Sequence, residues 1–144
     1  MKKLNKLTAT ILACAMMLMM AACGSKSYSS LEEWYLDNPA YEKTMQTMLN
    51  SQKTEGLSME FDIKDNNLVY RYIYDNQVFG QSEEIDAAAK EMLDSALEQQ
   101  KSNFTQGIDE IAKASKIDAS TISVVLEYYN PGESTPSYSQ SFTK

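Results

Sequence analysis

Histidine is absent from this chain of 144 residues, and cysteine occurs only at Cys14 and Cys23. Histidine is the usual general base and a preferred metal ligand, so its absence excludes Ser-His and Cys-His nucleophile systems and zinc sites of the Cys/His type. No glycine-rich phosphate loop is present, and 13 basic side chains face 20 acidic ones, which disfavours nucleic acid. We therefore predict a protein that is not an enzyme and has no cofactor, no metal and no nucleic-acid partner.

The N-terminus has the layout of a secretory signal peptide. Lys2, Lys3 and Lys6 precede an unbroken run of apolar or small residues from 11 to 22, which is the order of charged and apolar regions in such peptides. As a helix this run covers about 18 Å, less than the roughly 30 Å of hydrocarbon in a bilayer. We therefore predict that residues 1–22 are a signal peptide and not a membrane span.

Met20-Ala21-Ala22-Cys23 resembles the lipobox of bacterial lipoproteins, with methionine in the place of the commoner leucine. The resemblance implies that a diacylglyceryl lipid is attached to Cys23 and that the chain is cleaved before it. Cys14 is a weaker candidate, because cleavage before it leaves an apolar segment at the N-terminus of the mature chain. Since two acyl chains anchor a protein stably, we expect an extracytoplasmic protein that is held to the cell membrane through the lipid on Cys23.

The predicted mature chain contains a short linker and one domain. Residues 23–30 form a Gly/Ser linker that carries the lipidated Cys23, and residues 31–144 have the length of a single domain. Removal of residues 1–22 takes away three basic side chains and no acidic one, so the net charge changes from −7 to −10. Anionic lipid repels such a body, and no second cysteine remains for a disulfide. The anchor therefore has to be covalent.

Two short helices are expected near the start of this domain. Ser30 and Glu33 have the spacing of a capping box, which predicts a helix that ends near Leu36. Asn38 as the cap and Pro39 at the first helical position predict a second helix, and its apolar spacing continues to about residue 53.

A longer helical pattern covers residues 83–115. Its apolar positions keep one drifting face that continues through Gly107. At about 50 Å, such a helix exceeds the roughly 35 Å diameter of a domain of this size, so it overhangs, curves or kinks. We predict a continuous helix, because the apolar phase carries through.

Four segments alternate between apolar and polar residues in the way that half-buried strands do. They form two hairpins, 57–64 with 68–75 around a turn at 65–67, and 122–128 with 138–142 around a loop at 130–136. We therefore predict an α+β fold in the order helix, hairpin, helix, hairpin. Its four-stranded antiparallel sheet has the long amphipathic helix packed on one face.

Aromatic side chains are concentrated in these strands. One interpretation is a binding surface, because tyrosine combines apolar area with a polar tip. The other is a core, with the hydroxyl groups reaching its rim. The pattern leaves both open, and the candidates for a binding surface are Tyr70, Tyr72, Tyr74, Tyr129, Tyr138 and Trp34.

Other polar patterns have simpler explanations than catalysis or metal binding. Glu60 and Asp62 lie about 7 Å apart on one strand face, but glycosidase carboxylates flank a cleft in a much larger body. Residues 65–67 lack the spacing of a calcium loop and fit a turn. The pair Ser141 and Lys144 has Ser-x-x-Lys spacing, but at the chain end and not at the start of a helix.

The stretches SLEEWYLDNP, LSMEFDIKDNNLVYRYIY and SVVLEYYN, with the lipobox and the long helix, resemble a family of small Gram-positive lipoproteins classed as a domain of unknown function. The resemblance spans most of residues 31–144 and brings no catalytic residues. We expect a non-catalytic binding or interaction module at the cell surface, which holds a protein or glycan partner. The alternatives are a small carboxylate-based hydrolase of the cell envelope and an accessory solute-binding component.

Overall fold

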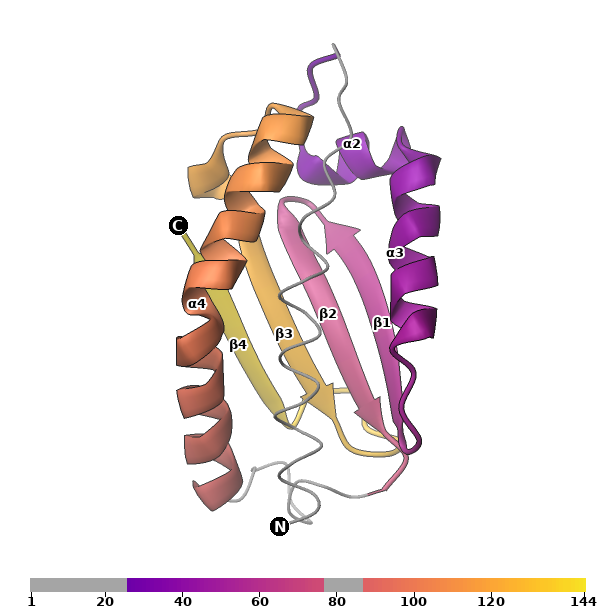
Figure 1. Ribbon diagram of the computed structural model, residues 1–144, viewed down its shortest axis with the longest axis vertical. Helices are drawn as coiled ribbons and strands as arrows, with labels where there is room; N and C mark the ends of the chain where they lie inside the picture. The colour runs from indigo at the N-terminus through magenta and orange to yellow at the C-terminus, as the bar shows by residue number, and fades with distance from the viewer. Residues whose placement is uncertain (1–25, 77–86) are drawn as a thin grey trace.

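The computed structural model describes residues 26–76 and 87–144, so Cys23 and the predicted signal peptide lie outside the described residues. Helices and strands alternate along the chain as two αββ units (Figure 1). The elements are α2 (Leu31–Leu36), α3 (Pro39–Ser51), β1 (Leu57–Lys64), β2 (Asn67–Tyr74), α4 (Ala87–Ser115), the 3-10 turn η1 (Ala119–Thr121), β3 (Ser123–Tyr129) and β4 (Tyr138–Thr143).

The four strands form one sheet in the order β1-β2-β3-β4, which confirms the α+β class and the two hairpins. The prediction of an antiparallel sheet is wrong, because β2 and β3 are parallel. The 29 residues of α4 cover about 43 Å, more than the roughly 27 Å of an eight-residue strand. The helix therefore returns the chain to the end of the sheet where β2 began, and β3 starts there in the same direction as β2.

The first helical part is two helices joined by a sharp bend. Ser30 accepts a hydrogen bond from the Glu33 amide at 3.1 Å, which confirms half of the predicted capping box. The Glu33 carboxylate binds the backbone and side chain of Ser29 in place of the Ser30 amide. Asn38 occupies the predicted N-cap position of α3, before Pro39. Its side chain does not bond to the first turn of α3 and donates to the carbonyl of Trp34 at 2.6 Å. This bond fixes the bend between α2 and α3.

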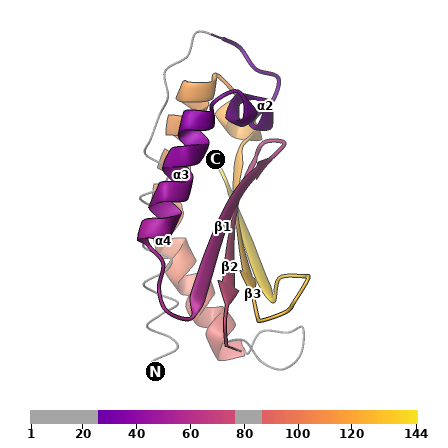
Figure 2. The same cartoon turned by 90° about the vertical axis from the view of Figure 1, so that its right-hand side faces the viewer.

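All three helices lie on one side of the sheet (Figure 2). The helices α2 and α3 pack against β1, and α4 packs against β4 and β3. From Ala87 to Ser115 α4 is continuous, without a break at Gly107. Residues 83–86, the start of the predicted helix, lie outside the described residues. The 3-10 turn before β3 is an element that the sequence analysis does not predict.

The core fills the space between this inner face of the sheet and the helices. Leu57, Phe61 and Ile63 on β1 alternate with exposed residues, and the same alternation of buried with less buried residues continues on β3. From α4, Phe104 is fully buried and stacks on Phe142 of β4, with ring centroids 4.8 Å apart. The outward-pointing residues of each strand therefore form a second face that no described helix covers.

Candidate functional site

Most of the aromatic candidates are parts of the core. Tyr70, Tyr72 and Tyr74 lie on the inner face of β2 and are at most 4% exposed, and Trp34 of α2 is 1% exposed. Tyr72 stacks on Tyr128 of the neighbouring strand, with ring centroids 4.8 Å apart. This arrangement corresponds to the second interpretation of the tyrosine pattern, in which the rings pack and are not available to a ligand.

Tyr138 and Tyr129 lie in different surroundings. Tyr138, at the start of β4, is 6% exposed, and its hydroxyl group donates a hydrogen bond to Asp94 of α4. Burial, followed by this bond, raises the pKa of Tyr138. Tyr129 points to the opposite, partly exposed face of β3. Of the six aromatic candidates, it is therefore the one that lies on an accessible face of the sheet.

This outer face is the side of the sheet opposite the helices (Figure 2). Two apolar pairs lie on its central strands, Val69 of β2 opposite Val125 of β3 and Ile73 opposite Tyr129, and the pair of Arg71 and Glu127 lies between them. Val69 is only 7% exposed, although it is not part of the core cluster. The surrounding outward-pointing residues are polar: Ser58, Glu60, Asp62 and Lys64 on β1, and Ser139, Ser141 and Thr143 on β4. A mixture of apolar and polar groups of this kind is also found in protein interfaces.

A polar cluster crosses the two central strands on this face. Arg71 Nε donates to Glu127 Oε2 at 3.1 Å, and the hydroxyl of Tyr129 donates to the same oxygen at 2.8 Å. The side chains of Arg71 and Glu127 are 33% and 21% exposed. Burial, followed by the bond to Glu127, raises the pKa of Tyr129. The cluster holds a guanidinium group and a phenol ring in fixed positions at the surface, and both are frequent in protein interfaces.

Sequence reasoning did not find this cluster, because Arg71 and Glu127 are 56 residues apart and meet only through the register of a parallel pair. The only signal was the position of each residue on the outward-pointing side of its strand.

The carboxylates considered for catalysis are not arranged around a cleft. Glu60 and Asp62 are exposed on the outer side of the edge strand β1. Ser141 is exposed on the outer side of β4, whereas Lys144 pairs with Asp109 of α4 on the helical side. Ser141 and Lys144 therefore do not form a catalytic pair.

The polar turn considered for calcium is used by the fold itself. The Asp65 amide donates to Glu32 of α2 at 2.8 Å, and the Asn66 side chain accepts from the Leu31 amide and donates to Thr121. Within residues 26–76 and 87–144, no group of three or more acidic or cysteine side chains is placed to hold a metal ion.

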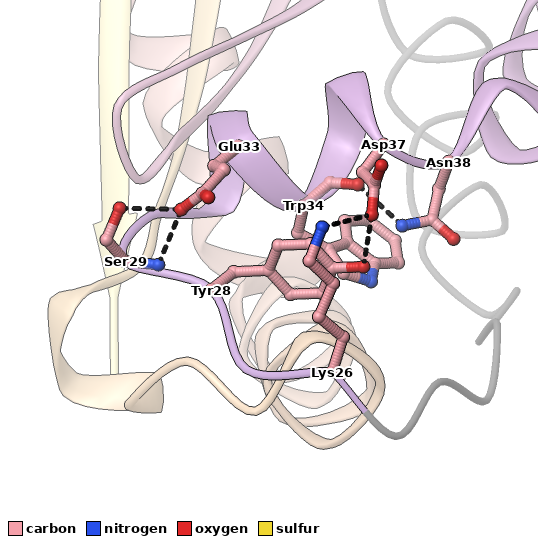
Figure 3. A network of polar contacts seen from close by, with 7 residues as sticks. All are labelled: Lys26, Tyr28, Ser29, Glu33, Trp34, Asp37 and Asn38. Atoms are coloured by element: carbon pink, nitrogen blue, oxygen red, sulfur yellow. Dashed lines mark hydrogen bonds and ion pairs between the residues drawn. The ribbon is translucent and has the colours of Figure 1, made fainter.

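The segment just before α2 is held against that helix by side-chain bonds (Figure 3). We call residues 26–30 the N-terminal strap. Lys26 Nζ and the Tyr28 hydroxyl both bind Asp37 Oδ2 at 2.9 Å, and Glu33 Oε2 accepts from Ser29 N at 2.8 Å and from Ser29 Oγ at 2.6 Å. The bond from Lys26, followed by that from Tyr28, holds the pKa of Asp37 below its ordinary value. This part of the predicted linker is thus attached to the domain.

The loop between β3 and β4 forms a shallow hollow at the other end of the sheet, lined by residues 132–137. Its shape depends on Glu133, which accepts hydrogen bonds from the Asn130 amide and from the side chain of Ser137. The bond from Ser137 is the main cause that lowers the pKa of Glu133. The Glu133 carboxylate is therefore occupied by its own loop.

Together, these features define a small α+β domain in which helices cover one face of the sheet and no described helix covers the other. Residues 31–142 match the family described as Domain of unknown function (DUF4854), and the chain belongs to this family. Comparisons with curated proteins and with solved structures gave no significant match. Among the described helices, none combines the length and the apolar character that a membrane crossing needs.

Proposed function

We propose that this protein is an extracytoplasmic lipoprotein of Gram-positive type, anchored by a diacylglyceryl lipid on Cys23, which binds a protein partner without catalysing a reaction. The proposal of an anchor is supported by the lysines, the apolar run and the lipobox-like sequence that ends at Cys23. The lipid confines the domain to the membrane surface, and the domain supplies the binding surface.

The observation that carries the binding role is the outer face of the sheet, which no described helix covers. Val125 and Ile73 are half-buried on this face, on the two sides of the pair of Arg71 and Glu127. Partly exposed apolar side chains beside a fixed polar cluster favour a protein partner, because burial of apolar area drives association. The exposed position of Glu60 and Asp62 supports the non-catalytic role, because acid–base catalysis needs carboxylates near a bound substrate.

A photo-crosslinking amino acid at Val125 in intact cells tests this role. We expect a covalent adduct with one predominant protein, identified by mass spectrometry. The matched control carries the same amino acid at Gln46, an exposed residue of α3 on the other side of the sheet, and we expect no such adduct from it. Absence of an adduct from Val125 and also from Ile73 would contradict a partner on the outer face. Cys23→Ala should be released from the membrane or keep residues 1–22 unprocessed. A Cys23→Ala chain that is cleaved and still attached to the membrane would contradict the lipid anchor.

A further inference from the structure

The N-terminal strap determines which end of the domain is close to Cys23. Lys26 is the third residue after Cys23, and three residues span about 10 Å when extended. Lys26 and Tyr28 are both bound to Asp37, at the C-terminal end of α2. The attachment point therefore cannot move far from this end of the domain while the strap is formed.

The same end carries an exposed apolar side chain. Leu36, next to Asp37, is 74% exposed and is the one large hydrophobic residue in the described parts of the chain that is exposed. Figure 1 shows α2 across one end of the sheet, at the end opposite to the β3–β4 connection. A leucine beside a lysine and a tyrosine is a typical combination at a membrane interface, where Lys and Tyr keep their polar ends in water.

We propose that the α2 end of the domain faces the membrane and that Leu36 inserts into the interfacial region of the outer leaflet. This inference rests on the proposed acylation of Cys23. Contact with the bilayer is shallow, because Glu32 and Glu33 lie in the same short helix and avoid the hydrocarbon. In this orientation the strands stand away from the membrane, the outer face of the sheet is accessible from the side, and the β3–β4 loop is the distal tip.

Depth-dependent quenching of single fluorescent labels tests the orientation. Cys23 is consumed by the lipid, so a cysteine introduced at Ala40 or at Ser134 is the only free thiol of the mature lipidated protein. Ala40 is exposed beside the bend after α2, and Ser134 is exposed in the distal loop. In phosphatidylcholine and phosphatidylglycerol vesicles containing a spin-labelled lipid, we expect several-fold stronger quenching at position 40 than at position 134.

Two substitutions separate the contributions of the strap and of Leu36. Asp37→Asn removes the ion pair with Lys26 and should reduce the difference between the two labels. Asp109→Asn removes a carboxylate of the same charge that pairs with Lys144, and it should leave the difference unchanged. Leu36→Ser should lower quenching at position 40 without releasing the protein from the vesicles.

Vesicle flotation distinguishes failure of this inference from failure of the proposed function. If the acylated protein floats with the vesicles but both labels are quenched equally, the fixed orientation is wrong and the lipoprotein function is unaffected. If quenching at position 40 does not change in Leu36→Ser, the insertion of Leu36 is wrong. If the protein with native Cys23 carries no lipid and does not float, the proposed anchor is wrong, and the orientation inference fails with it.

Discussion

Arg71 on β2 lies directly opposite Glu127 on β3, and its Nε donates to Glu127 Oε2 at 3.1 Å. The two residues join the two αββ units across the parallel strand pair. Tyr129 donates to the same carboxylate oxygen at 2.8 Å. The pair therefore links the two central strands in their observed register, on the face that no described helix covers.

A double-mutant cycle measures the interaction free energy between Arg71 and Glu127. Because the two side chains are one third and one fifth exposed, solvent weakens the pair, and we expect a coupling free energy of about 0.5–1 kcal/mol between Arg71→Met and Glu127→Gln in urea unfolding. The matched control is the pair of Glu98 and Lys101 on α4, which is more than half exposed and should give a coupling near zero. Equal coupling in both pairs would contradict a role in the register.

The contact between α4 and β4 depends on Phe104. Phe104→Ala removes a fully buried ring that stacks on Phe142, so we expect a loss of about 3–5 kcal/mol in the free energy of unfolding. Leu36→Ser, at an exposed position, should change stability by less than about 0.5 kcal/mol. A small effect of Phe104→Ala in chemical denaturation would show that α4 is not packed on the sheet as described.

Replacement of tyrosine by phenylalanine should have different effects on stability at Tyr138 and at Tyr72. Tyr138→Phe removes a donor to Asp94 and should cost about 1 kcal/mol of stability. In Tyr72 the hydroxyl is buried with no hydrogen-bond partner among the described residues, so Tyr72→Phe should be neutral or stabilising by up to about 1 kcal/mol. Urea unfolding of both variants checks this, and a clear loss with Tyr72→Phe would contradict the described surroundings of that hydroxyl.

The N-terminal strap should stay attached to α2 in mild acid. In the folded state the pKa of Asp37 is lowered from 3.8, so the strap's contribution is present above that pH and is lost as the pH falls through the lowered pKa. A spin label on a cysteine introduced at Ser27, in a chain from residue 23 with Cys23→Ala, should stay immobile from neutral pH down past 3.8 and become mobile only below the lowered pKa of Asp37.

In the same chain, Asp37→Asn removes the charge that pairs with Lys26, whereas the bonds from Ser29 to Glu33 remain. The label should then be more mobile at neutral pH than in the chain with Asp37. A transition near neutral pH, or equal mobility of the label with and without Asp37→Asn, would show that Asp37 does not hold the start of the strap.

Local sequence patterns predicted the hairpins and the long helix, because each depends on neighbours in the chain. The turn at Asp65 is one example, since aspartate tolerates the positive φ of 53° found there. The apolar face that continues through Gly107 is another, because its periodicity depends only on the helix itself. The direction of β3 could not be predicted in this way. It depends on the end of the sheet at which α4 ends, and the local sequence does not determine that position.

The candidate site was less predictable than the fold, because the tyrosine pattern is the same for a core and for a binding face. Only the side of the sheet that the helices cover decides between them, and this places Tyr70 inside and Tyr129 outside. The strap could not be predicted either. The bond between Lys26 and Asp37 joins two exposed residues, and such pairs leave no recognisable pattern in the sequence. Long-range contacts of this type are set by packing and not by local preference.

The parallel pairing of β2 with β3 also affects how the polypeptide is made. Synthesis runs from the N-terminus, so the hairpin of β1 and β2 emerges from the ribosome long before β3, whose Glu127 follows Arg71 by 56 residues. During that interval the edge of β2 has no strand to pair with, and such edges promote aggregation. Until β3 arrives, this edge of β2 is therefore open to pairing with a strand of another copy.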